Sequence, residues 1–187
     1  MENTVREDAI LERLEGVESQ LAIGQLAIRY ALAVDARDVD AWLALFVPDV
    51  QVGPDRFGRE ALREYIEPRL RLFYRSMHQI CGHRIELQGR DHARGQVYCR
   101  AEQEFGDRWI VLAVCYFDTY RRVEGEWLFA RRKERLWYSA DVTERPQSVG
   151  FDGWPEGSGP ADLPHAFESW APFWEAGDPV GGVTDSR

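Results

Sequence analysis

One histidine, one aspartate and one tyrosine have the types and surroundings that best suit acid–base chemistry. His78 lies in Ser76-Met77-His78, between an arginine-rich helical segment and a long strand-like segment. A histidine beside a carboxylate can act as a general base near neutral pH, because the carboxylate fixes its tautomer and stabilises the imidazolium. Tyr30 and Asp35 lie five residues apart at the end of the first helical region, where Tyr30 belongs to the apolar stripe. Each residue also has a purely structural interpretation. His78 would be a structural histidine, Tyr30 a core aromatic residue with a satisfied hydroxyl, and Asp35 a residue at a helix end or turn.

A second set of polar groups lies on the last strand-like segment, 127–138. Alternation places Arg132 and Glu134 on one face with Leu128, Ala130 and Leu136. The opposite face then holds Phe129, Arg131, Lys133, Arg135 and Trp137. If the first face lines a pocket, Arg132 would suit an anionic or carbonyl group of a substrate or transition state. The period of two does not decide which face points inward, and a solvated basic run is the alternative.

Other common catalytic patterns are absent from the sequence. The four histidines include no H-x-x-x-H pair; His78 and His83 are separated by a presumed loop, and His83 and His92 are expected to be solvated. The three cysteines are widely spaced and form no C-x-x-C pair, which argues against a disulfide framework or a zinc site. There is no G-x-S-x-G, no P-loop and no G-x-G-x-x-G after a strand. We therefore expect neither a metal nor a cofactor.

The elements that must position these residues follow from a change of hydrophobic period along the chain. Apolar spacings of three and four predict a helix over about 7–34, with Gly24 as a candidate joint. Shorter helices are predicted at 38–46, capped by Asp38, and at 59–75, which Pro68 should kink or split. Apolar and polar residues then alternate, which predicts strands at 50–52, 84–87, 93–105, 109–122 and 127–138. Helices followed by long antiparallel strands indicate an α+β fold.

Length and composition favour one domain. The 187 residues are 44% hydrophobic, as in an ordinary globular protein. We assign 1–140 to this domain and 141–187 to a Gly/Pro- and aromatic-rich extension. Residues 142–154 could form a lid or pack on the outside, and the end of the extension is expected to be disordered. The net charge of −9 argues against a nucleic-acid partner. No apolar run is long enough to span a membrane and the N-terminus lacks a signal-peptide pattern, so we expect a cytoplasmic protein.

Four segments resemble the SnoaL-like branch of the NTF2-like superfamily. They are R-Y-A-L-A-V-D-A-R-D, S-M-H, D-H-A-R-G-Q-V-Y and G-E-W-L-F-A-R-R, within a match over about residues 7–140. Within that branch, the chain is most similar to the group of scytalone dehydratase, bile-acid 7α-dehydratase and hexachlorocyclohexane dehydrochlorinase. The resemblance implies a cone-shaped α+β barrel with N-terminal helices packed on a curved, mostly antiparallel sheet.

The resemblance also implies roles for individual residues. Asp35 and His78 match the family's Asp–His dyad, in which the histidine abstracts a proton. Tyr30 matches a tyrosine that polarises a carbonyl or assists the leaving group in the dehydratases, and Arg132 matches an arginine used by the dehydrochlorinase. Gln103 departs from the pattern, because dehydratases of the group place a second acid or base at this point. Tyr30, a water or another residue would have to supply that proton.

These residues together predict a cofactor-independent lyase or isomerase that acts on an apolar cyclic molecule, such as a steroid, polyketide or terpenoid-like ring. The expected pocket lining is Trp42, Phe46, Val97, Cys99, Gln103 and Phe105. The alternatives are polyketide cyclisation through the same dyad and a non-catalytic ligand-binding module on the same fold. We also expect a homodimer or homotrimer through an apolar outer sheet face that carries Phe129, Trp137 and Trp109.

Overall fold

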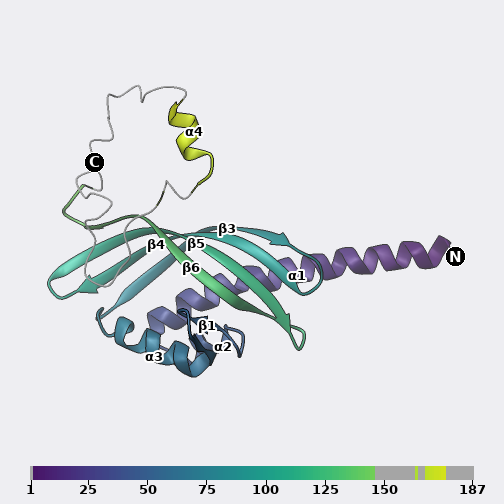
Figure 1. Cartoon of the computed structure of the whole chain (residues 1–187), viewed down its shortest axis with the longest axis horizontal. Helices are drawn as coiled ribbons and strands as arrows, with labels where there is room; N and C mark the ends of the chain where they lie inside the picture. The colour runs from purple at the N-terminus through teal and green to yellow at the C-terminus, as the bar shows by residue number, and fades with distance from the viewer. Residues whose placement is uncertain (1, 146–162, 164–166, 176–187) are drawn as a thin grey trace.

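The computed structural model describes residues 2–145, 163 and 167–175, and these form an α+β fold (Figure 1). The helices are α1 (Glu2–Ala36), α2 (Val39–Ala44), α3 (Gly58–Leu70) and α4 (Trp170–Glu175). The strands are β1 (Gln51–Val52), β2 (Arg56–Phe57), β3 (Ser76–Leu87), β4 (His92–Phe105), β5 (Arg108–Val123) and β6 (Glu126–Asp141). The predicted order of helices first and long strands second is therefore confirmed. No helix among these residues is long and apolar enough to cross a membrane.

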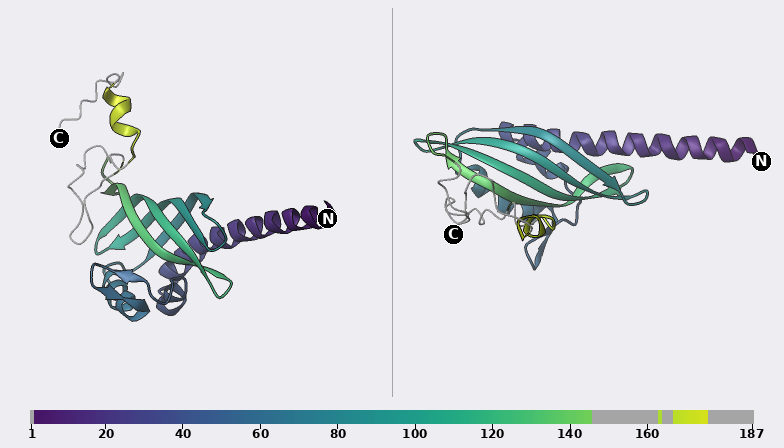
Figure 2. Two further views of the ribbon diagram at one scale, coloured as in Figure 1. Left: turned by 45° about the vertical axis from the view of Figure 1, so that its right-hand side comes forward. Right: turned by 90° about the horizontal axis from the view of Figure 1, so that it is seen from above.

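The first three helices lie on one side of the main sheet, where α1 packs on β3 and β6, α2 packs on α1, and α3 packs on α2 and on the β1–β2 pair (Figure 2). Helix α1 continues through Gly24 without a joint, and it buries Ile23 and Leu26 in the core. Asp38 caps α2 by accepting a hydrogen bond from the Ala41 amide at 2.9 Å, as its residue type predicts. Helix α3 ends at Leu70, two residues after Pro68, so it is shorter than the predicted helix.

The main sheet has the strand order β3-β4-β5-β6, and every neighbouring pair is antiparallel. It curves around the helices without closing into a complete barrel (Figure 1). The segment before β1 covers part of the free edge of β6, since the Val47 amide donates to the Phe129 carbonyl at 3.0 Å and the Phe129 amide donates to the Leu45 carbonyl at 2.8 Å. We call the face that carries the helices the inner face and the opposite face the outer face.

Strand β3 is longer than predicted, and a bulge at Cys81 changes the alternation within it. The register passes from the pair Ile80–Cys99 to the pair Gly82–Tyr98 and leaves Cys81 unpaired. An extra residue in one strand moves every later side chain to the other face. His78 and His83 therefore share the inner face of one strand, and the predicted loop between them was wrong. The prediction that His83 is solvated was also wrong, because its side chain is half-buried and hydrogen-bonded.

Strand β6 contains two more bulges, which explain a second correction. Ala130 has no partner residue on β5, because the pair Tyr120–Phe129 is followed directly by the pair Thr119–Arg131. Trp137 is left unpaired in the same way. Because of the first bulge, Phe129 and Arg132 lie on the same inner face rather than on opposite faces. Phe129 is completely buried in the core. It therefore contributes nothing to an outer interface, contrary to the expectation from simple alternation.

Leu163 and Phe167 of the C-terminal extension contact the outer face, and α4 stands clear of the sheet on that side (Figure 1). The Leu163 amide donates a hydrogen bond to the Leu136 carbonyl of β6 at 2.9 Å. The Phe167 ring packs on Phe117 and on Trp137, and Trp137 also stacks on Tyr98. These contacts cover apolar outer residues within the same chain. The candidate lid at 142–154 and the C-terminal end at 177–187 lie largely or wholly outside the described residues.

A groove of about 320 Å³ also lies on the outer face, away from the predicted dyad. Its lining includes the cations Arg84, Arg94, Arg131 and Lys133. Arg84 and Lys133 stand at the two ends of one cross-strand row. Arg94 and Arg131 belong to the neighbouring row, which ends at Glu86 on β3. The basic run of β6 is therefore partly a surface feature, as the structural interpretation predicts.

Candidate active site

Asp35 and His78 lie in direct contact although they are 43 positions apart in the sequence. Asp35 lies in the last turn of α1, and His78 is the third residue of β3. The His78 Nδ1 and Asp35 Oδ1 atoms are 2.7 Å apart. The His78 backbone amide donates to Asp35 Oδ2 at 2.8 Å, so both carboxylate oxygens are fixed against the same residue.

The environment of Asp35 determines the tautomer of His78. Partial burial raises the pKa of Asp35, but hydrogen bonds from the His78 side chain and amide and from Ser76 outweigh it and lower the pKa below its usual range. An ionised carboxylate only accepts hydrogen bonds, so Nδ1 carries the proton and Nε2 presents its lone pair. No described residue hydrogen-bonds to Nε2, and the His78 side chain is 7% exposed. The imidazole is thus mostly shielded, with its basic nitrogen free.

Two residues that the sequence analysis did not assign support this pair. The Ser76 hydroxyl donates to Asp35 Oδ1 at 2.9 Å, and Arg37 Nη1 donates to Ser76 Oγ at 2.8 Å. Arg37 also donates to the carbonyls of Val34 and Phe73, and its φ of 60° lies in the left-handed region. This conformation turns the chain sharply at the end of α1. The only sequence signal for both residues is their position, two residues beyond Asp35 and two before His78.

Tyr30, five residues before Asp35 on α1, lies in an aromatic cluster. Its ring contacts Trp42, Phe46, Tyr116 and Phe129, at centroid distances of 5.8 to 6.5 Å. Burial raises the pKa of Tyr30 to about 12, although the charge of Arg132 opposes this effect. The phenol therefore keeps its proton throughout the physiological pH range, and it can act as a hydrogen-bond donor but not as a phenolate base.

Arg132 lies on the inner face, where it is held by a carboxylate and three rings. Its Nε and Nη2 atoms donate to the two oxygens of Asp118 at 3.0 and 2.7 Å, and both side chains are almost completely buried. The guanidinium carbon lies 4.2 to 4.3 Å from the ring centroids of Tyr30, Tyr116 and Phe129. Arg132 Nη1 is buried and has no hydrogen-bond partner. Its charge is therefore already paired with Asp118, and one donor remains uncommitted.

The Arg132–Asp118 pair continues into a buried polar chain. The Tyr120 hydroxyl donates to Asp118 Oδ2 at 2.9 Å, and His83 Nε2 lies 2.9 Å from the same hydroxyl. Burial and the Asp118 charge raise the pKa of Tyr120 above its usual range, so Tyr120 remains a neutral donor. The network fixes Asp118 and through it the guanidinium of Arg132.

Gly95 makes room for this network. A Cβ atom at this position would lie 2.9 Å from the Tyr120 ring and hydroxyl and 3.0 Å from the Arg84 carbonyl. We expect Gly95→Ala to destabilise the protein by about 1–3 kcal/mol, the usual cost of overpacking a filled interior. Chemical denaturation measures this change, and Gly82→Ala, where no heavy atom lies within 4 Å of the added Cβ, is the matched control in a neighbouring strand. Equal stabilities of the two variants would contradict the prediction.

Glu134 is a further carboxylate on the inner face that the sequence analysis placed beside Arg132 without assigning it a role. It pairs with Tyr116 across β5 and β6, and the Tyr116 ring contacts the Tyr30 ring in a tilted arrangement. Glu134 nevertheless remains exposed, so the inner face is open to solvent at this point. The surrounding protein raises its pKa by reducing its hydration, and the charges of His78 and Arg132 partly oppose this effect. No hydrogen bond or ion pair to another described residue engages it.

The expected lining residues are divided between the core and the edge of the site. Trp42, Phe46, Val97 and Cys99 are all at most 4% exposed, and burial raises the pKa of the Cys99 thiol to about 12. Gln103 and Phe105 are less buried, and Gln103 Oε1 has no hydrogen-bond partner. Ala101 is the cross-strand neighbour of His78. Among the described residues, no group of three or more metal-ligating side chains lies together.

Comparison with known proteins places this arrangement in a family. The sequence model described as a SnoaL-like domain matches residues 15–133. A candidate scytalone dehydratase from Novosphingobium aromaticivorans is 24% identical, with a TM-score of 0.60 over 78% of this chain and 97% of its own. A hexachlorocyclohexane dehydrochlorinase from Novosphingobium barchaimii is 21% identical, with a TM-score of 0.63 over 71% of this chain and 96% of its own.

A candidate aromatic ring hydroxylase from Novosphingobium aromaticivorans is 26% identical, with a TM-score of 0.59 over 67% of this chain and 94% of its own. No curated protein sequence matches the chain. These solved structures share the fold of this chain. The family match spans more than half of the chain, Asp35 and His78 included. The chain belongs to the SnoaL-like family.

Proposed function

We propose that this protein is a cofactor-independent lyase or isomerase in which His78 abstracts a proton from carbon. The observation that carries the proposal is the 2.7 Å contact between His78 Nδ1 and Asp35 Oδ1, together with the free Nε2 on the other side of the ring. A non-catalytic module would have no need to fix a histidine in this tautomer. The solved dehydratase and dehydrochlorinase structures support the same class of reaction.

The reaction starts with proton transfer to Nε2 of His78. The carbon that loses the proton lies next to a carbonyl, or next to a carbon that bears a leaving group. The C–H electron pair moves to the carbonyl oxygen or forms the new double bond as the leaving group departs. Asp35 stabilises the imidazolium through Nδ1–H, and the neutral Tyr30 phenol can donate to developing negative charge.

Glu134 is the best-placed group to supply a second proton. A leaving hydroxyl must be protonated, and Gln103 cannot transfer a proton. The Glu134 carboxyl is accessible from the inner face, and reduced hydration raises its pKa above the usual value of a glutamate, toward the range in which a general acid works. We therefore propose Glu134 as the general acid for an oxygen leaving group, with His78 as the base.

The proposed substrate is an apolar cyclic molecule. The aromatic cluster of Tyr30, Trp42, Phe46, Tyr116 and Phe129 makes the interior beside the inner face apolar, and Tyr30 is its one partly exposed member. The chlorinated ring named for the dehydrochlorinase is a molecule of this kind. Steroid, polyketide and terpenoid-like rings also meet this description.

The test uses three probes that share the first step: a β-hydroxy cyclic ketone, a β,γ-unsaturated steroid ketone and hexachlorocyclohexane. Each is incubated with the protein in D₂O, and mass spectrometry follows product formation and deuterium in the recovered substrate. Conversion of a probe, or exchange of its acidic C–H, supports proton abstraction. An aldol product from a polyketide-like diketone would favour the cyclase alternative. Ligand retention without conversion or exchange of any probe would favour the binding module.

Glu134→Gln separates the two proton-transfer steps. We expect it to lower dehydration of a β-hydroxy ketone by about 10²-fold or more, the usual contribution of a general acid, because glutamine cannot donate a proton to the leaving hydroxyl. Deuterium exchange next to the carbonyl should persist, since it needs only His78. As the acid, Glu134 is active below its raised pKa, so the wild-type dehydration rate should fall as pH rises through that pKa. Equal loss of exchange and dehydration would contradict this role.

A further inference from the structure

Helix α1 carries a stripe of large apolar side chains that the rest of the described chain leaves uncovered. Ile10, Leu14, Val17, Leu21 and Ile28 are between 43% and 65% exposed. Soluble monomers rarely expose a continuous apolar surface of this length. We call these five residues the α1 stripe.

The stripe has the spacing of a coiled coil. Its members are four, three, four and seven residues apart, so Leu14, Leu21 and Ile28 occupy the a positions of successive heptads, while Ile10 and Val17 occupy d positions. The stripe covers about three heptads, which is the shortest length at which this pattern identifies a coiled coil. Leu11 and Leu32 are also exposed and border the stripe at e positions.

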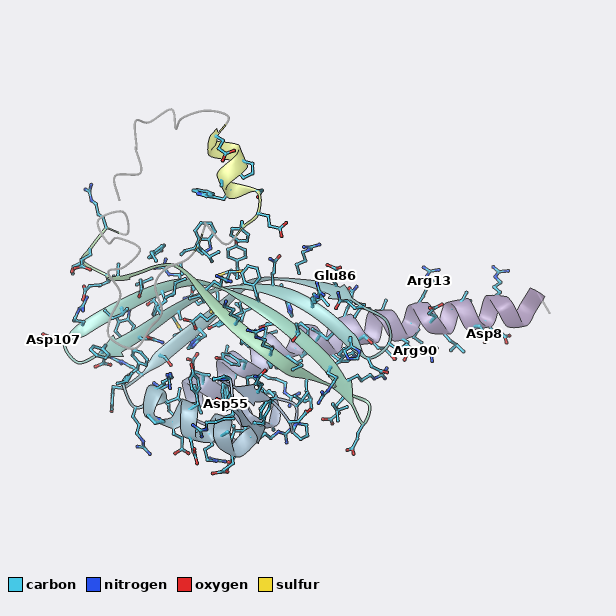
Figure 3. The ribbon with its side chains drawn as sticks, in the orientation of Figure 1. Asp8, Arg13, Asp55, Glu86, Arg90 and Asp107 are labelled. Atoms are coloured by element: carbon cyan, nitrogen blue, oxygen red, sulfur yellow. The ribbon has the colours of Figure 1, made fainter. Side chains whose placement is uncertain are left out.

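The stripe faces away from the body of the protein. At 100° per residue, its centre lies about 180° around the helix from Ser19, Ile23 and Leu26, which pack toward the sheet. Glu15, on the packed side, forms an ion pair with Arg122 of β5 at 2.8 Å. The N-terminal part of α1, which carries Asp8 and Arg13, extends beyond the sheet (Figure 3). A second helix could therefore lie along the stripe without meeting the sheet of its own protomer.

We propose that two copies of this chain associate through their α1 stripes as a parallel two-stranded coiled coil. The flanking charges support a second copy as the occupant. In a parallel pair, a g residue faces the e residue of the next heptad of the other helix. This rule brings Arg13 next to Glu18 of the partner subunit, twice in the symmetric pair, and the charges are opposite. In this arrangement the two α1 stripes meet at the centre of the dimer. The sheet of each protomer lies on the side of its own α1 that faces away from the partner helix.

Gly24 occupies the one d position within the stripe that lacks an apolar side chain. It is helical, and no heavy atom lies within 4 Å of a Cβ added there. A leucine at this position should fill the seam without a clash inside the protomer. The interface therefore offers one substitution that should strengthen association as well as others that should break it.

Sedimentation equilibrium of the full chain, over a wide concentration range, tests the proposal. The wild type should reach twice the 21.6 kDa mass of one chain. Leu21→Glu places a charge in the seam and should raise the dimer dissociation constant by about 100-fold or more. Ala22→Glu introduces the same charge at the adjacent exposed position outside the seam, and it should leave the constant near the wild-type value. Gly24→Leu should lower it. Circular dichroism checks that each variant remains folded.

A cross-link tests the parallel orientation. In a parallel pair, the two Leu14 side chains face each other across the symmetry axis. Leu14→Cys in a Cys81→Ser background, which removes the exposed native thiol, should form a disulfide between chains on mild oxidation. A monomeric wild type, or an oligomer that Leu21→Glu leaves intact, would overturn the proposal. A dimer that depends on Leu21 but does not cross-link at residue 14 would overturn the parallel arrangement.

Discussion

His78→Gln should lower turnover of an accepted probe by about 10²–10⁴-fold, the usual contribution of a positioned general base. Glutamine is close to histidine in size and can still donate a hydrogen bond to Asp35, but it offers no basic nitrogen in place of Nε2. Deuterium exchange into the probe should disappear together with product formation. Both readouts depend on the same proton transfer, so they should fall in parallel.

Asp35→Asn is the companion to this variant. An amide at residue 35 no longer stabilises the imidazolium, and it no longer requires the Nδ1–H tautomer of His78. We expect a loss of turnover close to that of His78→Gln, and the double variant should be little worse than either single one, because the two residues act as a unit. Full activity of His78→Gln on a converted probe would show that the base is another residue.

Asp118→Asn should destabilise the fold by about 3–5 kcal/mol, the cost of leaving one partner of a buried ion pair alone. Arg132 and Asp118 are almost completely buried, and two hydrogen bonds of 3.0 and 2.7 Å join them. Without the carboxylate, the guanidinium keeps its three aromatic neighbours but loses its counter-charge. Guanidinium or urea denaturation gives the difference in unfolding free energy.

Removing both charges provides the control for this prediction. Asp118→Leu with Arg132→Met should be less destabilising than Asp118→Leu alone, since no unpaired buried charge remains. The order of the two stabilities distinguishes lost ion pairing from a general packing defect. A surface substitution without structural effect changes the unfolding free energy by at most about 0.5 kcal/mol. If the unfolding free energy of Asp118→Asn differs from that of the wild type by no more than this, the ion pair does not hold Arg132 as described.

The two predictions test different parts of one arrangement. His78 and Asp35 carry out the proposed chemistry where the end of α1 meets the start of β3. Asp118, Tyr120 and His83 form a separate network that holds Arg132 against the rings of Tyr30, Tyr116 and Phe129. We therefore expect Asp118→Asn to affect activity mainly through the position of Tyr30, whereas His78→Gln should leave stability almost unchanged.

Local patterns predicted most elements of this fold. The helical period of α1, the Asp38 cap and the alternation along β4 are properties of residues close in sequence, and the structure contains each of these features. The motifs around Tyr30, Asp35 and His78 indicated the family and the residues of the proposed dyad. The helix and the strand needed only the rule that one side of each is apolar, while the cap and the motifs needed only residue types close in sequence.

The main failures of the sequence analysis involve strand bulges. Single-residue bulges at Cys81, Ala130 and Trp137 change which face the later side chains occupy, and a strict period of two cannot anticipate them. Phe129 was therefore expected on the outer face, whereas it lies on the inner face. His83 was expected in solvent because it was placed beside a polar turn, whereas β3 already includes it and the bulge at Cys81 turns it to the inner face. A bulge depends on the partner strand, so it is decided when the strands pair.

By itself, the sequence determined the helices, the long antiparallel strands and the acid–base residue types, because short-range periodicity and residue chemistry encode them. Only the tertiary structure decided which of these residues meet. It brought Asp35 within 2.7 Å of His78, paired Arg132 with Asp118, and left Glu134 exposed on the inner face. It also turned one apolar side of α1 to the sheet and the other to solvent. These outcomes depend on long-range register and on the close packing of a helix against a curved sheet, which no local pattern specifies.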